Sequence, residues 1–317
     1  LGYLIADDAQ REYLPWIERM SAFIKHYDQR NLVAATMLTL RSPGSVIPEE
    51  WDRWKQVLDI PITYIYPMHN YAPGIPVIGG AQGYDNIAAL ADNVRSVWGD
   101  EVYFVLWSQA HMQGPVYDSF GLALNDPVNH PFIQETIQPF ADQQRLILYR
   151  TAMAGAKGNF LFTYQTGFRD ESLAAGRRNE IRAVRAELSP FDAMILAGER
   201  RTESTGTADL KAVSYADGGA KVILIAQSVP ESETGYTEGR IHEDVTLTVE
   251  APDVQHVYQV TADTVVQLPV TAEDGMITFT LEPFDTTSIV YMSTDAGQLS
   301  AWTGYYDAIR EQRLRWR

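Results

Sequence analysis

The chain has 317 residues, of which 45% are hydrophobic and 21% charged, a balance typical of a globular protein with room for one barrel or two domains. Its formal net charge of −16 argues against binding to nucleic acid, whose phosphates require a basic surface, and against an anionic membrane face. The absence of cysteine excludes disulfides, thiolate nucleophiles and cysteine-ligated metals. An acidic surface suits neutral partners such as sugars, or serves solubility alone.

Two kinds of targeting segment are not visible in the sequence. No apolar run approaches the roughly 20 residues that span a bilayer, so we expect no membrane span. No signal peptide is visible either. The chain opens on residues 1–6, which have the pattern of a buried strand rather than of a natural N-terminus.

Five apolar runs alternate with amphipathic segments between residues 1 and 198. Their near-continuous hydrophobicity is typical of strands buried on both faces of a parallel sheet. The runs are residues 2–6, 32–40, 62–66, 102–107 and 158–164.

The segments between these runs have helical periodicity. Apolar residues step by three and four in residues 13–27, 87–98 and 181–195, and Pro48 with two following acids marks a helix start. Such βα units close into a barrel or form an open doubly wound sheet. No glycine-rich phosphate fingerprint follows a strand, which disfavours a dinucleotide fold, and residues 79–83 are predicted to be a loop.

Short runs rich in β-branched residues replace this pattern after residue 198. They occupy residues 222–226, 245–249, 254–260, 276–281 and 287–292, with turn signals between them. We predict an antiparallel β-sandwich domain over residues 199–295, in which Thr246 and Thr248 face solvent. Residues 296–317 are predicted to form a helical tail that docks on a neighbour.

Four stretches of this sequence resemble the back half of glycoside-hydrolase barrels of the β-galactosidase superfamily. Residues 4–8 are similar to the fourth barrel strand, 105–109 to the seventh, 152–160 to the passage into the eighth, and 281–285 to the end of the C-terminal β-domain. The resemblance implies that residues 1–198 are the C-terminal part of a (β/α)₈ TIM barrel containing strands four to eight. The first three strands would then come from a missing N-terminal segment or a second chain, and the alternative is a half-barrel that dimerises.

The resemblance also implies a pair of catalytic carboxyl groups, and this chain departs from the family at both positions. The related enzymes have a glutamate acid/base after strand four and a glutamate nucleophile after strand seven, where this chain has Asp8 and Gln109. We therefore predict Asp8 as the general acid, with a pKa raised by a hydrophobic neighbour, and Asp118 as a base acting through water. The alternative for Asp7 and Asp8 is a structural role as the N-cap of the following helix.

Barrel enzymes bind substrate at the carboxyl ends of their strands, which nominates a set of polar and aromatic residues. Some of the aromatic residues instead fill barrel layers, and Arg41 pairs with Asp7 or Asp8 as readily as with a sugar. The histidines have no metal-binding spacing, so we expect no metal and no cofactor. The predicted substrate-binding residues are Asp7, Arg41, His69, Asn70, Tyr71, Trp107, Gln109, His111, Tyr164 and Gln165.

Two functions remain open from the sequence. The first is a glycoside hydrolase-like protein that acts on carbohydrate. The second is a catalytically inactive barrel that binds glycan or serves as a structural module of an extracellular assembly. Both imply carbohydrate as the partner and a location outside the cell or at its surface.

Overall fold

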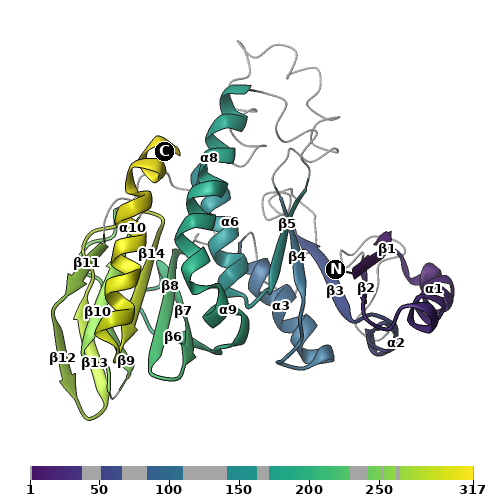
Figure 1. Ribbon diagram of the computed structural model, residues 1–317, viewed down its shortest axis with the longest axis horizontal. Coiled ribbons are helices and arrows are strands. Elements are labelled where there is room, and N and C mark those ends of the chain that lie inside the picture. Colours follow the sequence, from purple (N-terminus) through teal and green to yellow (C-terminus); the bar gives the residue numbers. More distant parts are fainter. Residues whose placement is uncertain are drawn as a thin grey trace. The chain divides into compact units, whose positions relative to one another are not determined.

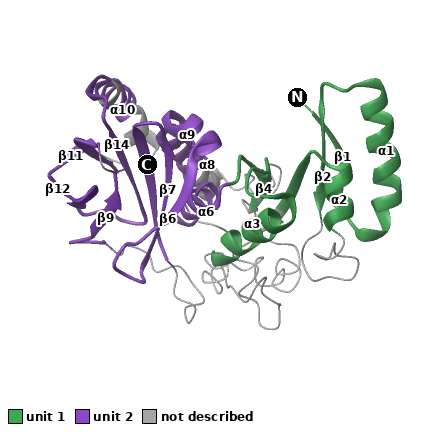
Figure 2. Cartoon of the chain, turned by 90° about the horizontal axis from the view of Figure 1, so that it is seen from below, with its two compact units in different colours: residues 1–109, 156–162 green, residues 110–155, 163–317 purple. Residues whose placement is uncertain are grey.

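A computed structural model describes residues 2–37, 51–65, 84–109, 141–162, 171–228, 241–251, 253–261 and 265–316. The chain divides into two compact units (Figure 2). The first contains residues 1–109 and 156–162, and the second contains residues 110–155 and 163–317.

The first unit is built on a five-stranded sheet in which every strand pairs in parallel with the next along the chain (Figure 1). This confirms that the five predicted apolar runs are parallel neighbours. The strands are β1 (Gly2–Ala9), β2 (Leu32–Met37), β3 (Ile60–Ile65), β4 (Val105–Gln109) and β5 (Gly158–Phe162).

The sequential strand order β1-β2-β3-β4-β5 decides between the two predicted architectures. Parallel crossovers are almost always right-handed, so a sheet that grows in one direction places all its crossover helices on one face. A doubly wound sheet reverses its order instead. The order is therefore that of a barrel.

Both faces of this sheet carry buried side chains. Val33, Ala35 and Met37 alternate along β2 and are fully buried. The register places Ile62 and Val105 in one row of the other face, and two rows further along the strands Phe160 is 52% exposed.

The described helices of the first unit begin and end near their predicted positions. Gly99 closes α3 with a φ of 93°, and its amide donates to the carbonyl of Arg95, which confirms the predicted glycine stop. The helices are η1 (Arg11–Tyr13), α1 (Leu14–Tyr27), α2 (Trp51–Val57) and α3 (Asp85–Trp98).

The second unit contains helices from the strand–helix part of the sequence, residues 1–198, and one helix from the C-terminal end of the chain. Helix α6 contacts α8, and α10 contacts α8 and β14, so the predicted C-terminal helix forms and docks within this chain. The helices are α6 (Ala141–Met153), α8 (Glu171–Leu188), η5 (Ser189–Phe191), α9 (Asp192–Ala197) and α10 (Ala296–Trp316).

Two antiparallel sheets complete the second unit and share one hydrophobic core. One has the order β11-β10-β14-β8-β7-β6 and the other β12-β13-β9. Their strands are β6 (Glu199–Glu203), β7 (Leu210–Asp217), β8 (Ala220–Gln227), β9 (Thr246–Glu250), β10 (His256–Val260), β11 (Val265–Leu268), β12 (Val270–Glu273), β13 (Met276–Thr280) and β14 (Thr287–Ser293).

Strand β9 shows why the alternating pattern was informative. Leu247 and Val249 are buried in the shared core, while Thr246 and Thr248 are exposed, as predicted. The hydroxyls of the two threonines lie 2.9 Å from those of Thr280 and Thr278 on β13, forming cross-strand pairs on the exposed face.

Candidate functional site

The candidate site is the edge of the parallel sheet where all five strands end. Because the strands are parallel, their carboxyl ends meet at this edge, which is where barrel enzymes bind substrate. Asp7 and Asp8 belong to the last three residues of β1, and Gln109 is the last residue of β4. The topology thus brings these three backbone positions to one edge.

The backbone of β1 is irregular at this edge. Its pairing with β2 shifts register between Leu4 and Ala6 and again between Ala6 and Ala9. Each shift adds one residue to β1, and such bulges are over-represented next to active sites because they redirect side chains. The Asp7 side chain is exposed.

Neither aspartate occupies the N-cap position of the helices that follow β1. The N-cap residue of η1 is Gln10, which makes no side-chain capping hydrogen bond, and the N-cap residue of α1 is Tyr13. Strand β1 continues to Ala9, three residues beyond its predicted end, because pairing with β2 extends to Met37. The backbone groups of Asp7 and Asp8 therefore belong to a strand rather than to a helix terminus.

Strand β4 carries two of the predicted residues. In the backbone register Trp107 pairs with Tyr64 on β3 and Phe160 on β5, and Gln109 pairs with Phe162. If β1 is the fourth barrel strand, β4 is the seventh, so Gln109 ends the strand on which related enzymes carry a nucleophile.

The remaining predicted residues lie outside the described residues. They follow the carboxyl ends of β2, β3, β4 and β5 in the sequence, so the structure leaves their roles as predictions. These residues are Arg41, His69, Asn70, Tyr71, His111, Asp118, Tyr164 and Gln165.

Two threonines near the same edge were missed by sequence reasoning. Thr36 of β2 and Thr63 of β3 are almost fully buried, and their hydroxyls have no hydrogen-bond partner among the described residues. A buried hydroxyl without a partner costs about 1–3 kcal/mol, so such groups call for a specific explanation. The signal that would have identified them is a polar residue inside a run that is otherwise apolar.

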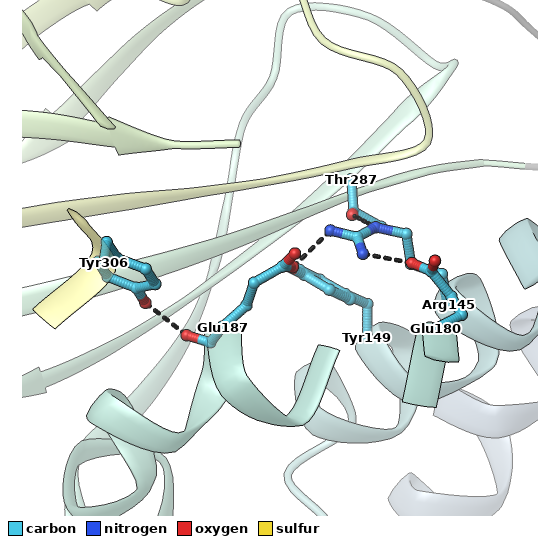
Figure 3. A network of polar contacts seen from close by, with 6 residues as sticks. All are labelled: Arg145, Tyr149, Glu180, Glu187, Thr287 and Tyr306. Atoms are coloured by element: carbon cyan, nitrogen blue, oxygen red, sulfur yellow. Dashed lines mark hydrogen bonds and ion pairs between the residues drawn. The ribbon is translucent and has the colours of Figure 1, made fainter. Parts of the chain in front are cut away.

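A second concentration of charge lies in the second unit, away from the sheet edge in sequence, and is centred on Arg145 of α6 (Figure 3). The guanidinium donates to Glu180 at 2.5 Å, to Glu187, and to the hydroxyl of Thr287 at 2.7 Å. The hydroxyl of Tyr149 donates to Glu187 at 2.8 Å. We name Arg145, Tyr149, Glu180, Glu187 and Thr287 the buried ionic cluster.

Electrostatics within the buried ionic cluster favour the charged arginine. Burial opposes its charge, but the carboxylates of Glu187 and Glu180 hold the pKa of Arg145 well above its ordinary value. Burial, and then the charge of Glu187, raise the pKa of Tyr149 well above its ordinary value. With the Arg145, Glu180 and Glu187 side chains only 1–4% exposed, the cluster is closed to substrate, so we assign it to stability.

The antiparallel part of the chain contains an open polar groove of about 440 Å³. It is lined in part by Asp209, His242, Glu243 and Asp244, none of which was predicted as a site residue. In the part of the chain that the structure describes, no group of three or more histidine, aspartate or glutamate side chains is placed to hold a metal ion. No described helix is long and apolar enough to cross a membrane.

No protein-family model matches the chain, and comparison with curated proteins gives no significant match. Solved structures that it resembles include maltogenic α-amylase AmyB from Thermotoga neapolitana, with 9% identity and a TM-score of 0.49 over 89% of this chain and 60% of that one. Amy13B from Eubacterium rectale has 10% identity and a TM-score of 0.47, over 89% of this chain and 56% of that one. The family 51 α-L-arabinofuranosidase AbfB from Bifidobacterium longum has 10% identity and a TM-score of 0.42, over 89% of this chain and 63% of that one.

The chain therefore spans less than two thirds of each of these three proteins. Identities near 10% with TM-scores below 0.5 identify no family. The architecture of the chain rests on its own strand order and register.

Proposed function

We propose that this chain is the C-terminal part of a carbohydrate-active (β/α)₈-barrel protein, with strands four to eight followed by a β-sandwich domain. The observation that carries the proposal is the sequential, all-parallel order of β1 to β5, which brings the carboxyl ends of all five strands to one sheet edge. Sugars bind at that edge. The glycoside hydrolases of the β-galactosidase superfamily, which the sequence resembles, supply the substrate class.

In the hydrolase form of this proposal, Asp8 is the general acid and Asp118 the base. Support for Asp8 comes from its position at the carboxyl end of β1, within the stretch where the pairing with β2 shifts register. An inverting mechanism needs room for a water between the two carboxyl groups, which lie roughly 6.5–9.5 Å apart in such enzymes. The substrate contacts come from the predicted residues at the ends of the other strands.

Turnover of an aryl-glycoside panel tests this form. Changing Asp8 to asparagine removes the proton donor and should lower the rate by about 10²-fold or more. Asp92→Asn is the matched control, because Asp92 is an exposed residue of α3 whose ion pair with Arg95 lies on a helix surface. Unchanged hydrolysis in the Asp8 variant rejects the catalytic assignment.

A catalytically inactive sugar-binding barrel is the second candidate, and one observation favours it. Gln109 is the final residue of β4, where the resemblance expects a glutamate, and an amide cannot act as a carboxylate nucleophile. This candidate predicts no turnover on the panel together with measurable sugar binding by calorimetry. Binding should then be lost in Trp107→Ala or Tyr164→Ala and retained in Asp92→Asn.

A further inference from the structure

The open polar groove of the second unit is formed by two segments that are far apart in the sequence. One is the loop between β6 and β7, from Thr205 to Asp209, and the other is the approach to β9, from Ile241 to Thr246. Its volume of about 440 Å³ lies within the range of small-ligand sites, roughly 300–1,000 Å³. A sugar unit therefore fits in it.

Hydrogen bonds fix both walls of the groove. On one wall the hydroxyl of Thr205 donates to the carbonyl of Thr207 at 2.8 Å, and the amide of Asp209 donates to the Thr207 hydroxyl at 3.3 Å. On the other wall His242 exchanges backbone hydrogen bonds with Phe284 at 2.8 Å and 3.2 Å, and the two rings stack. Groups that are held in place before a ligand arrives lose little conformational entropy when it binds.

The charges of the groove restrict the ligands that it can take. Asp209, Glu243 and Asp244 contribute three carboxylates, and no lysine or arginine is among the described residues that line it. Because like charges repel at short range, a phosphate, a sulfate or a uronic acid is disfavoured. A metal ion is disfavoured as well, since no group of three or more acidic or histidine side chains in the described ranges is placed to hold one.

The groove combines its carboxylates with hydroxyl groups and an apolar side chain. Glu243 and Asp244 are exposed, and neither side chain bonds to another described residue, so both can accept hydrogen bonds from a ligand. Ile241 beside them is 62% exposed, although isoleucine is usually buried. Thr246 adds a hydroxyl that lies 2.9 Å from the hydroxyl of Thr280. A pyranose ring, with hydroxyl donors at its rim and C–H groups on its faces, matches this combination.

We propose that this groove is a second carbohydrate-binding site, which takes a neutral pyranose unit of a polysaccharide. Glu243 and Asp244 accept hydrogen bonds from the sugar hydroxyls, and Ile241 packs against the face of the ring. An organic cation would use the carboxylates and leave Ile241 without a contact. The site goes beyond the proposed function and shares no residue with the edge of the parallel sheet, so either site can fail without the other.

Affinity gel electrophoresis of the full 317-residue chain tests the proposal. Soluble starch, galactomannan and mixed-linkage β-glucan are the neutral probes, polygalacturonate is the anionic probe and chitosan the cationic one. We expect at least one neutral polysaccharide to retard the chain and polygalacturonate to have no effect. Retardation by chitosan alone overturns the proposal in favour of a cation site, and retardation by none of the neutral probes overturns it altogether.

Variants of the groove show whether the retardation arises there. Glu243→Gln, Asp244→Asn removes two charges and keeps the backbone, because asparagine also tolerates the φ of 55° found at Asp244. The dissociation constant for the retarding polysaccharide should rise about tenfold or more, since hydrogen bonds to charged acceptors are the stronger class. Ile241→Ser should raise it about fivefold through loss of apolar contact with the ring.

Glu273→Gln, Asp274→Asn is the matched control. It changes the same dipeptide in the turn between β12 and β13, where both residues are exposed, Asp274 has a φ of 50°, and neither residue lines the groove. Its dissociation constant should equal that of the wild type, and thermal unfolding should show both double variants folded. Unchanged affinity in the groove variant overturns the proposal, and an equal loss in the control overturns it in favour of an effect of overall charge.

Discussion

Helices α1 and α6 reverse the usual relation between polarity and burial. Helix α1 exposes Trp16 and Phe23, whereas α6 buries Arg145 at 1% exposure and Gln144 completely. The difference arises from neighbours rather than from the helices, because α6 contacts α8 and strands β7, β8 and β14, while one flank of α1 has no described neighbour. A helix's own apolar pattern shows which surfaces can be buried, and its neighbours decide which are.

The largest expected effect is on the buried ionic cluster. Arg145→Met retains much of the side-chain volume but leaves Glu180 and Glu187 buried without their cation. We expect the free energy of unfolding to fall by about 3–5 kcal/mol, the cost of breaking a buried ion pair from one side. Urea denaturation of the purified chain measures this.

Arg185→Met on α8 is the matched control for that substitution. Arg185 pairs with Asp192 at 2.8 Å, but the two side chains are 66% and 38% exposed, so the expected loss is about 0–1 kcal/mol. Similar losses in the two variants would mean that burial does not distinguish the two ion pairs.

An intermediate effect should separate the buried and the exposed apolar residues of α1. Ile17 is fully buried, and Ile17→Ala should lower the free energy of unfolding of the isolated chain by about 2–5 kcal/mol. Phe23→Ser, at a 60% exposed position, should change it by only about 0.5 kcal/mol in either direction, as is usual for exposed positions. Thermal unfolding of both variants checks this, and a large loss from Phe23→Ser would show that Phe23 already packs within this chain.

The smallest effect concerns Tyr149. The pKa of Tyr149 is raised in the folded state. Its contribution to the free energy of unfolding is therefore fully present below about pH 10, where the unfolded residue begins to ionise. Above that pH only the unfolded chain loses the proton, and stability falls by about 1.4 kcal/mol per pH unit until the folded pKa is reached.

Tyr149→Phe should remove this alkaline slope and lower the free energy of unfolding by about 1 kcal/mol at neutral pH, through loss of the hydrogen bond to Glu187. Urea midpoints between pH 8 and pH 11 measure both effects. Tyr305→Phe, at a 37% exposed position on α10, should leave the slope unchanged. A wild-type slope that persists in Tyr149→Phe would assign it to another group.

Several strands of the antiparallel sheets escaped sequence analysis. Strand β6 (Glu199–Glu203) contains four charged residues and no apolar residue, and it forms because it pairs with β7 at the sheet edge. Strands β11 and β12 are four residues each, too short for alternation to be distinctive. Pairing with the neighbouring strand of the chain, rather than their own residue pattern, defines these strands.

The sequence by itself determined the existence and order of the five parallel strands, because doubly buried strands need long apolar runs. Strand pairing decided where each one ends, as at Ala9 of β1. The sequence also determined the exposed threonine face of β9, because apolar and polar residues alternate along this strand and only the apolar face can pack against the core. It did not determine whether Asp7 and Asp8 end a strand or begin a helix, and they lie in β1. It also did not determine which line of α1 is buried: Ile17 is fully buried, whereas Tyr13 and Tyr27 are 45% and 73% exposed. Only the tertiary structure decided these points, because strand pairing and burial depend on atoms from other segments.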